Sequence, residues 1–517
     1  MTDPGSRHSR ESRTPEDFVS ASPEGSNPSG PAAGRLAGLA VGAVAILSSY
    51  LPVALPAGLE PAAVRLIGIT LTMGIWWVTE ALPIGATALV PAATFPLLSI
   101  APARPTTQAY MSPIIMLLFG GFLMALAVER SNAHRRLALH VLLGLGTSPR
   151  RLVLGFGVAA GLMSMWISNT ATSLLMMPIA VAVVNQAERE GGDGARAVHR
   201  FGIAILLAVA YGASVGGMAT PVGTPPNLIA MAALERTQAS TLTFATWSLR
   251  ALPAVVIILL LVCWVLVKVS PGVSARLALG AEESLRRQLG TLGPWRPSEW
   301  RSLAVFACVA VLWITRPDLQ WGADTTVLGW ASRLGLQGTH DGTIAMLGAL
   351  LVFLLPDGET GERLLPWSTA QRAPWGLLLL FGGGVSLSVG FQATGLSEYL
   401  GSSMAAWIGA SWPLFVALVC LGCTFGTEII SNTALANIAM PILVATAVAA
   451  DRDPRGLLLA SAMSCSCAFM MPMATGPNAI VFGSGRLRVA DMVRAGLLCN
   501  LLAWAVIVAA AMISYPN

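Results

Sequence analysis

The sequence predicts an all-α polytopic membrane protein, on three observations. Of the 517 residues, 55% are hydrophobic and only 11% are charged, with a mean hydropathy of +0.68, whereas a soluble domain has about 25% charged residues. Apolar runs long enough, or nearly long enough, to cross a bilayer recur along the chain. The polar triplet Ser-Asn-Thr occurs twice inside such runs, at residues 168–170 and 431–433. We expect about eleven transmembrane helices plus two re-entrant hairpins in two inverted repeats.

The apolar runs begin after a polar N-terminal segment and continue to the C-terminus. They lie at residues 36–55, 62–79, 82–100, 112–128, 152–186, 201–234, 250–270, 302–315, 343–355, 374–393, 403–450, 457–485 and 493–513. Several of the longest contain Pro, Gly and the Ser-Asn-Thr triplet. We expect these to be broken or re-entrant helices, because irregular backbone at membrane depth must be surrounded by protein or water.

Residues 1–34 are rich in Ser, Pro, Gly, Arg and Glu, and this composition predicts a disordered tail. The tail has no apolar core of the kind that a signal peptide needs. Of the 31 basic residues only Lys268 is a lysine, and Ala and Gly are abundant. This composition is typical of a GC-rich bacterial genome, so we expect the protein in a bacterial plasma (inner) membrane.

Arginines crowd three segments: the N-terminal tail, the loop 271–301 and the loop 486–494. The positive-inside rule places these segments in the cytoplasm. The segment 317–341 carries three aspartates against a few arginines, and residues 513–517 carry no charge. We therefore expect a cytoplasmic N-terminus and a C-terminus outside the cell.

Several function classes are disfavoured. The net charge of +5 comes from loops beside the spans and does not indicate a nucleic-acid partner. The seven cysteines lie in apolar segments, which indicates reduced, buried thiols, and the pair Cys420 and Cys423 has no second ligand pair nearby. No HExxH, GxSxG or Cys/His cluster occurs in the spans. We expect no enzyme activity.

The repeat extends beyond the two triplets, which are 263 residues apart. Residues 119–121 and 381–383 both read Phe-Gly-Gly, and each triplet is followed by a second Gly/Pro-rich break, at 216–227 and 471–478. A single Ser-Asn-Thr could serve only as a polar contact that holds neighbouring helices together. Two copies in register, each with a matching break, indicate a secondary transporter with a site near the bilayer midplane.

The residues at these breaks predict the charge of the ligand. Ser, Asn and Thr are good N-caps, and Pro225 and Pro477 suit the first turn of a half-helix, so several helix N-termini would converge on one anion. Segments 152–186, 201–234 and 457–485 contain no charged residue, and 412–450 contains only Glu428. Since no arginine offsets a dianion, we expect bound Na⁺, held by hydroxyl, amide and backbone oxygens. Glu428 is either a proton site or a local hydrogen-bond acceptor.

These motifs, with the segments 76–83, 223–227 and 474–478, resemble the divalent anion/sodium symporter family, the INDY-like carriers of dicarboxylates, citrate and sulfate. The resemblance covers nearly everything from about residue 36 onward. It implies a homodimer in which each scaffold domain holds a transport domain that moves as an elevator.

The resemblance also implies site residues. The first sodium site would use Ser164, Ser168, Asn169 and Gly223, and the second would use Thr427, Ser431, Asn432 and Ala474. The substrate would meet Ser168, Asn169, Thr170, Ser431, Asn432 and Thr433, with Thr224, Thr475 and Gly476 around them. Gly476 stands where many relatives have proline, so the preferred anion stays open.

We divide the chain into the tail 1–34, a first repeat at 35–245, connecting spans and a cytoplasmic loop at 246–340, and a second repeat at 341–517. The expected function is Na⁺-coupled import of C4 dicarboxylates such as succinate, malate or fumarate. A sulfate or citrate symporter, or a sodium-independent dicarboxylate exchanger of the same fold, remains an alternative. A channel is disfavoured, because paired broken helices are typical of an enclosed binding site and not of a ring of residues around a pore.

Overall fold

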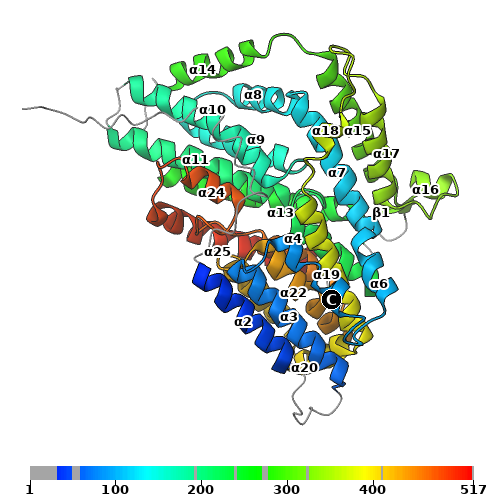
Figure 1. Ribbon diagram of the computed structural model, residues 1–517. Helices are drawn as coiled ribbons and strands as arrows, with labels where there is room; N and C mark the ends of the chain where they lie inside the picture. Colours follow the sequence, from blue (N-terminus) through cyan, green and yellow to red (C-terminus); the bar gives the residue numbers. More distant parts are fainter. Residues whose placement is uncertain are drawn as a thin grey trace, which may run out of the picture.

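The computed structural model describes residues 32–48, 59–190, 195–237, 242–269, 277–321, 325–408 and 411–514. The predicted tail therefore lies almost entirely outside the described residues, as do the last three residues of the chain. The described part is a helical bundle with one short two-stranded antiparallel sheet (Figure 1). The sheet pairs β1 (Leu319–Trp321) with β2 (Thr325–Val327). The all-α prediction is confirmed.

The helices up to the middle of the chain run from α2 to α13. They are α2 (Ala32–Ser48), α3 (Pro61–Thr79), α4 (Ile84–Thr87), α5 (Val90–Thr94), α6 (Ala103–Gln108), the 3₁₀ helix η1 (Ala109–Met111), α7 (Pro113–Arg130), α8 (Ala133–Leu145), α9 (Pro149–Ser164), α10 (Asn169–Glu190), α11 (Ala195–Gly217), α12 (Pro225–Thr237) and α13 (Phe244–Val269).

The remaining helices run from α14 to α25. They are α14 (Leu277–Thr291), α15 (Pro297–Thr315), α16 (Trp330–Arg333), α17 (Asp341–Leu354), α18 (Trp367–Ala370), α19 (Trp375–Ala393), α20 (Leu396–Ile408), α21 (Trp412–Gly426), α22 (Asn432–Ala449), α23 (Pro454–Cys465), α24 (Gly476–Phe482) and α25 (Val489–Ser514).

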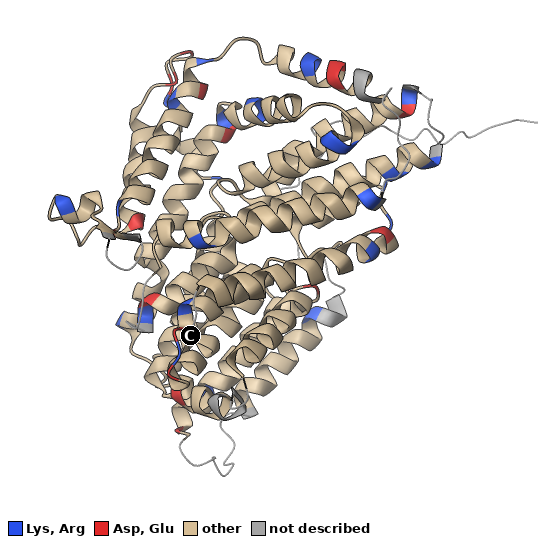
Figure 2. Cartoon of the chain, turned by 180° about the vertical axis from the view of Figure 1, so that it is seen from behind, with Lys and Arg blue, Asp and Glu red and all other residues tan. Residues whose placement is uncertain are grey.

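Within the described residues, nine helical segments are long and apolar enough to cross a membrane. Two of them, α10 and α22, begin at the Ser-Asn-Thr triplets, where the chain turns back from α9 and α21. The triplets thus lie at the tips of two helical hairpins. The predicted breaks also appear, because α11 and α12 are separate helices, as are α23 and α24. The long helices are largely free of charge, and most charged residues lie at helix ends and in connections (Figure 2).

The most extensive contact between two helices of the described bundle is between α9 and α11. A Cβ atom on Gly216 would overlap the carbonyl oxygen of Gly161, and one on Gly212 would overlap that of Gly157. In a membrane the hydrophobic effect does not drive helices together, so their association depends on close packing. Small residues at a spacing of four allow two helices to approach closely. This contact fixes the first hairpin against the helix that leads to the first break.

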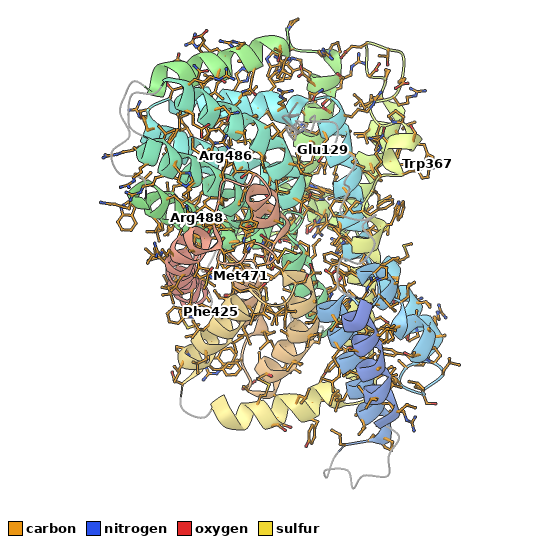
Figure 3. All side chains as sticks on the ribbon, turned by 60° about the vertical axis from the view of Figure 1, so that its left-hand side comes forward. Glu129, Trp367, Phe425, Met471, Arg486 and Arg488 are labelled. Carbon is orange, nitrogen blue, oxygen red and sulfur yellow. The ribbon has the colours of Figure 1, made fainter. Side chains whose placement is uncertain are left out.

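Contacts between residues that are far apart in sequence connect the two repeats. Arg486, just before α25, pairs with Glu188 at 2.5 Å and donates to Asn185 Oδ1 at 2.6 Å, both on α10 (Figure 3). Tyr211 on α11 donates its hydroxyl to the carbonyl oxygen of Phe469 at 2.5 Å. Helix α24 also packs on both α10 and α11. The hairpins and breaks therefore form one connected unit.

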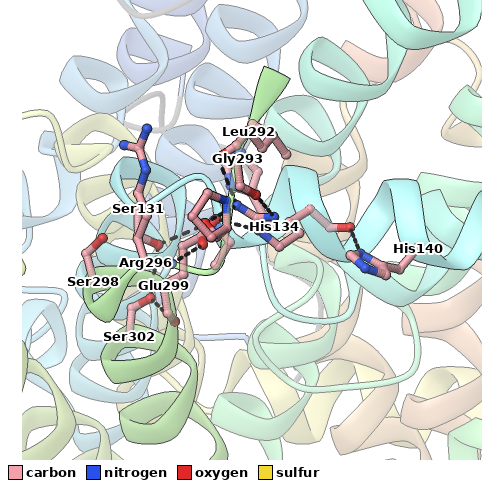
Figure 4. A network of polar contacts seen from close by, with 12 residues as sticks. Ser131, His134, His140, Leu292, Gly293, Arg296, Ser298, Glu299 and Ser302 are labelled. Atoms are coloured by element: carbon pink, nitrogen blue, oxygen red, sulfur yellow. Dashed lines mark hydrogen bonds and ion pairs between the residues drawn. The ribbon is translucent and has the colours of Figure 1, made fainter. Parts of the chain in front are cut away.

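A separate polar network fixes helix α8. Arg136 is 3% exposed and pairs with Glu299 on α15 at 2.9 Å. Its other nitrogens donate to the carbonyl oxygens of Leu292, Gly293 and Pro294, which follow α14 (Figure 4). A buried charge with this many acceptors is satisfied, and removing one partner would leave the other unpaired. The network joins α8, α14 and α15 at one end of the bundle.

Candidate binding site

Both triplets and both breaks line one cavity of about 210 Å³. All nine predicted substrate residues line it: Ser168, Asn169, Thr170, Thr224, Ser431, Asn432, Thr433, Thr475 and Gly476. Leu118 and Phe122 of α7 and Leu377 of α19 complete the wall. A larger cavity of about 520 Å³ lies between α12, α19, α20 and α22, and neither triplet lines it.

Four helices begin at the cavity: α10, α12, α22 and α24. Ser168 Oγ accepts from the backbone N–H of Ala171 at 3.2 Å, and Thr475 Oγ1 accepts from that of Asn478 at 3.3 Å, so both act as N-caps. Ser431 makes no such bond, contrary to the cap expected for the second triplet. No lining side chain is charged. The cavity thus offers first-turn N–H groups and hydroxyls to a ligand, which favours an anion.

The predicted sodium residues form two matched sets. Ser164 Oγ donates to Asn169 Oδ1 at 2.5 Å, and Thr427 Oγ1 donates to Asn432 Oδ1 at 2.6 Å. Ser164 and Thr427 do not line the cavity but lie directly behind the triplet asparagines.

The remaining predicted residue of each set, Gly223 or Ala474, belongs to the break. Gly223 and Ala474 line the same cavity, and a Cβ on Gly223 would lie 2.9 Å from the carbonyl oxygen of Ser164. Each set gathers hydroxyl, amide and backbone oxygens, which are the hard ligands that suit Na⁺.

Two asparagines that are not among the predicted site residues hold the breaks in shape. Asn227 Nδ2 donates to the carbonyl oxygens of Gly217 and Thr220 at 3.1 and 2.8 Å. Asn478 Nδ2 donates to those of Ala468 and Met471 at 2.9 and 3.0 Å, the equivalent positions of the second break. Both asparagines are 0% exposed. In the sequence they are the last residues of the two predicted breaks, 216–227 and 471–478, and their role follows from the geometry.

Two aromatic side chains also satisfy backbone carbonyls of the breaks. Trp247 Nε1 donates to the carbonyl oxygen of Met218 at 3.1 Å. The equivalent carbonyl, that of Phe469, accepts from Tyr211. Buried Trp and Tyr need a partner for their polar atom, but no sequence pattern connected these two residues with the breaks.

Glu428 accepts four hydrogen bonds. The backbone N–H groups of Phe469 and Met470 and the amide of Asn500 donate to Oε1 at 2.7–2.8 Å, and the N–H of Met471 donates to Oε2 at 2.9 Å. Of the two roles left open by the sequence, the structure shows local hydrogen bonding. The carboxylate fixes the second break to the second hairpin.

Gly476 lies directly against the first triplet in the cavity wall. A Cβ at this position would overlap Thr170 Oγ1. A proline or alanine here would push the two repeats apart or displace Thr170. The glycine therefore leaves room for the Thr170 side chain in the cavity.

The cysteines are as expected from the sequence: all seven are free thiols, and six are buried. Among the described residues no group of three or more His, Cys, Asp or Glu side chains is arranged to hold a metal ion. Cys420 and Cys423 are packing residues on α21.

Comparisons with known proteins agree with the motifs. The family model described as "Sodium:sulfate symporter transmembrane region" matches residues 35–516. The chain is 36% identical over 482 residues to a protein of Staphylococcus saprophyticus named "Sodium-dependent dicarboxylate transporter SdcS", covering 92% of this chain and 90% of that protein. It is 34% identical over 483 residues to the Staphylococcus aureus protein of the same name, with the same coverage.

Two solved transporter structures share the fold at 15% identity. The YdaH transporter of Alcanivorax borkumensis superposes with a TM-score of 0.52, over 93% of this chain and 97% of that one. MtrF of Neisseria gonorrhoeae superposes with a TM-score of 0.53, over 93% and 95%. The family is one of membrane transporters and not of enzymes. The chain belongs to the sodium:sulfate symporter family, the divalent anion/sodium symporters that its motifs resemble.

Proposed function

We propose that the protein is a Na⁺-coupled symporter that imports C4 dicarboxylates. The observation that carries the proposal is a single uncharged cavity lined by both Ser-Asn-Thr triplets and bordered by four helix N-termini. Relatives at 34–36% identity carry the name of sodium-dependent dicarboxylate transporters. Two matched polar tips suit a ligand with two matched carboxylates.

In this mechanism each triplet takes one carboxylate through hydroxyl, amide and first-turn N–H donors. Burying two negative charges without cations is costly, so Na⁺ binds behind each triplet, at the sets that include Ser164 and Thr427. Asn169 and Asn432 stand between ion and substrate, with Oδ1 toward the sodium set and Nδ2 free for the carboxylate. Because one side chain serves both ligands, each ligand favours the binding of the other.

The site would move across the membrane as one unit. Residues 36–130 mainly and 250–400 partly form the scaffold, and the hairpins and breaks form the transport domain. The scaffold contributes only apolar side chains to the cavity, those of Leu118, Phe122 and Leu377. An apolar wall makes no hydrogen bond that sliding would break. The contacts of Tyr211 and Arg486 that join the repeats would travel with the site.

The protein is a multi-pass membrane protein. We place it in a bacterial plasma membrane as a homodimer, with the N-terminus in the cytoplasm and the C-terminus outside. The distribution of arginines supports this orientation. Arg486, in the connection before α25, bonds to the end of α10, so the start of α25 and the base of the first hairpin lie on the same side, although most of the predicted loop 486–494 is the first turn of α25.

The test is uptake of radiolabelled succinate into proteoliposomes, with and without a Na⁺ gradient, competed by malate, fumarate, citrate and sulfate. We expect uptake that requires Na⁺ and is competed best by malate and fumarate. Strongest competition by sulfate or citrate would replace the substrate assignment. Equal exchange of succinate in choline and in Na⁺ would replace symport with exchange.

A further inference from the structure

The cavity of about 520 Å³ shares three helices with the smaller cavity that both triplets line. Helix α12 lines the smaller cavity at Pro225 and the larger one at Arg236, and α19 lines them at Leu377 and Ser388. Helix α22 begins at the second triplet and lines the larger cavity through its later turns. Positions eleven residues apart on an α-helix are separated by about 16 Å, so the two cavities follow one another along the same helices.

We call this larger cavity the outer cavity, and its polar lining residues are Arg236, Ser388, Gln392, Ser397, Glu398 and Ser402. Helix α20, which contributes to it, lies at the opposite end of the molecule from α14 (Figure 1). Since α14 belongs to the arginine-rich loop 271–301, our proposed orientation puts the outer cavity on the outside of the membrane. Gln392, Glu398 and Ser402 are exposed, so the outer cavity reaches the protein surface there.

The guanidinium group of Arg236 has no ion-pair or hydrogen-bond partner in the part of the chain that the structure describes. The carboxylate of the preceding residue, Glu235, lies 3.5 Å from Nε2 of His340. Glu398, the other charged lining residue, forms no ion pair with Arg236. A guanidinium presents a planar fork of donors that matches a carboxylate, so Arg236 is available to an anion in the outer cavity.

The other features of the outer cavity suit a weak and hydrated anion site. Its volume exceeds the 210 Å³ of the smaller cavity, so a bound ligand keeps part of its water. Three serine hydroxyls and the amide of Gln392 offer neutral donors, whereas the carboxylate of Glu398 repels an anion and lowers its affinity. None of the predicted sodium residues lines the outer cavity, so binding there does not require Na⁺.

We propose that the outer cavity is a second binding site for the dicarboxylate, in which Arg236 holds a carboxylate weakly and without Na⁺ before the substrate reaches the triplets. The inference rests on the proposed transport of dicarboxylates and adds an entry site to it. Arg236 raises the local concentration of the dianion, as a charged cleft does for a ligand of opposite charge. A substrate released from Arg236 lies beside the three helices that continue to the triplets.

The experiment measures succinate binding to the purified protein without Na⁺, by the rise in melting temperature during a titration with choline succinate at constant ionic strength. We expect a weak, saturable rise in the wild type and none in Arg236→Gln, each measured from the variant's own melting temperature in choline. Arg333→Gln is the matched control, because Arg333 is exposed on α16 and does not line the outer cavity, and it should keep the wild-type response. Equal responses of the wild type and Arg236→Gln would overturn the inference.

The two charges of the outer cavity give opposite predictions, which a purely structural role of Arg236 does not. Glu398→Gln should lower the half-saturating succinate concentration by about fivefold, the effect of one unit charge at contact distance in water. Arg236→Lys keeps the charge but loses the fork, so its affinity should lie between those of the wild type and Arg236→Gln. An unchanged or weaker succinate affinity in Glu398→Gln would contradict the inference.

The remaining outcomes separate the occupant and the two proposals. A rise that depends on Arg236 and is produced by phosphatidylglycerol, but not by succinate, would assign the outer cavity to a lipid headgroup and overturn the inference. Na⁺-dependent succinate uptake by a protein that binds no succinate in choline would overturn the inference alone. A wild-type protein that neither takes up nor binds succinate would overturn the proposed function as well.

Discussion

Asn169 and Asn432 are the residues on which the account of coupling depends. Each accepts a hydroxyl hydrogen bond within its own hairpin and faces the common cavity. An Asn side chain has one acceptor and one donor end, so it can face a cation on one side and an anion on the other. A Ser or Thr in that place offers a single oxygen for both tasks.

Asn432→Ala should therefore weaken the binding of both Na⁺ and dicarboxylate. Loss of a hydrogen bond to a charged group costs ~1.5–3 kcal/mol, or roughly tenfold to over a hundredfold in affinity. Isothermal titration of the purified variant with succinate and with Na⁺ measures both effects.

The chain offers a matched control for this substitution. Asn437 lies on the same helix, α22, is 0% exposed, and has no hydrogen-bond partner among the residues that the structure describes. Asn437→Ala should leave both affinities unchanged. Wild-type affinities in Asn432→Ala would remove this residue from the site.

At the scale of helices and breaks, the sequence predicted those elements whose composition is unusual for a membrane span. Polar triplets and Gly/Pro breaks inside apolar runs located the hairpin tips and the four helix starts, because polar backbone in hydrocarbon needs a partner. The partners could not be predicted, because they come from distant positions in ordinary surroundings. Tyr211 reaches a break 258 positions away, and Asn500 reaches Glu428 from 72 positions away.

The apolar part of the site was hidden for a similar reason. Leu118, Phe122 and Leu377 sit in uninterrupted apolar runs, where nothing distinguishes a cavity wall from a packing contact. Ser431 shows the opposite case. Its residue type favours an N-cap, but its side chain makes no capping hydrogen bond in the structure. Residue type indicates which groups need partners, and the fold decides which partners they find.

The contact between α9 and α11 gives a prediction at this scale. In Gly216→Ala the new Cβ would meet the carbonyl oxygen of Gly161, so the helices must separate and the first hairpin tip must shift. We expect a loss of stability of about 1–3 kcal/mol, as for overpacking of a tight core, measured as a lower melting temperature in detergent. Gly144→Ala on α8 is the control, because its Cβ would meet nothing within 4 Å. Similar melting temperatures for the two variants would contradict the close-packing account.

The whole molecule is divided, in our proposal, into a scaffold and a transport domain that slides against it. Gly74 on α3 and Ile438 on α22 lie in contact across this boundary, since a Cβ on Gly74 would be 3.3 Å from Ile438 Cδ1. Glu188 and Arg486, by contrast, are paired within the transport domain. These two pairs allow one test with an internal control.

In a background without the seven native cysteines, a thiol cross-link between Gly74→Cys and Ile438→Cys should stop succinate flux while succinate binding persists. A cross-link between Glu188→Cys and Arg486→Cys should leave flux largely intact, because both positions move together. The measurement is proteoliposome uptake before and after cross-linking and again after reduction. Undiminished flux through the fully linked 74–438 protein would exclude the elevator.

Orientation in the membrane is testable in the same background. Arg287 on α14 and Leu336 after α16 are both exposed, and in the orientation that we propose from the arginine distribution they lie on opposite sides of the membrane. An impermeant maleimide added to intact cells should label Leu336→Cys and spare Arg287→Cys until the cells are permeabilised. The reverse pattern would invert the proposed topology.

In our proposal one cavity, built by two repeats, binds Na⁺ and a dicarboxylate cooperatively. The most direct measurement is the succinate affinity of the purified protein in Na⁺ and in choline, together with its Na⁺ affinity with and without succinate. We predict that Na⁺ raises the succinate affinity and that succinate raises the Na⁺ affinity by the same factor, as linkage requires. Equal succinate affinity in Na⁺ and in choline would contradict the account.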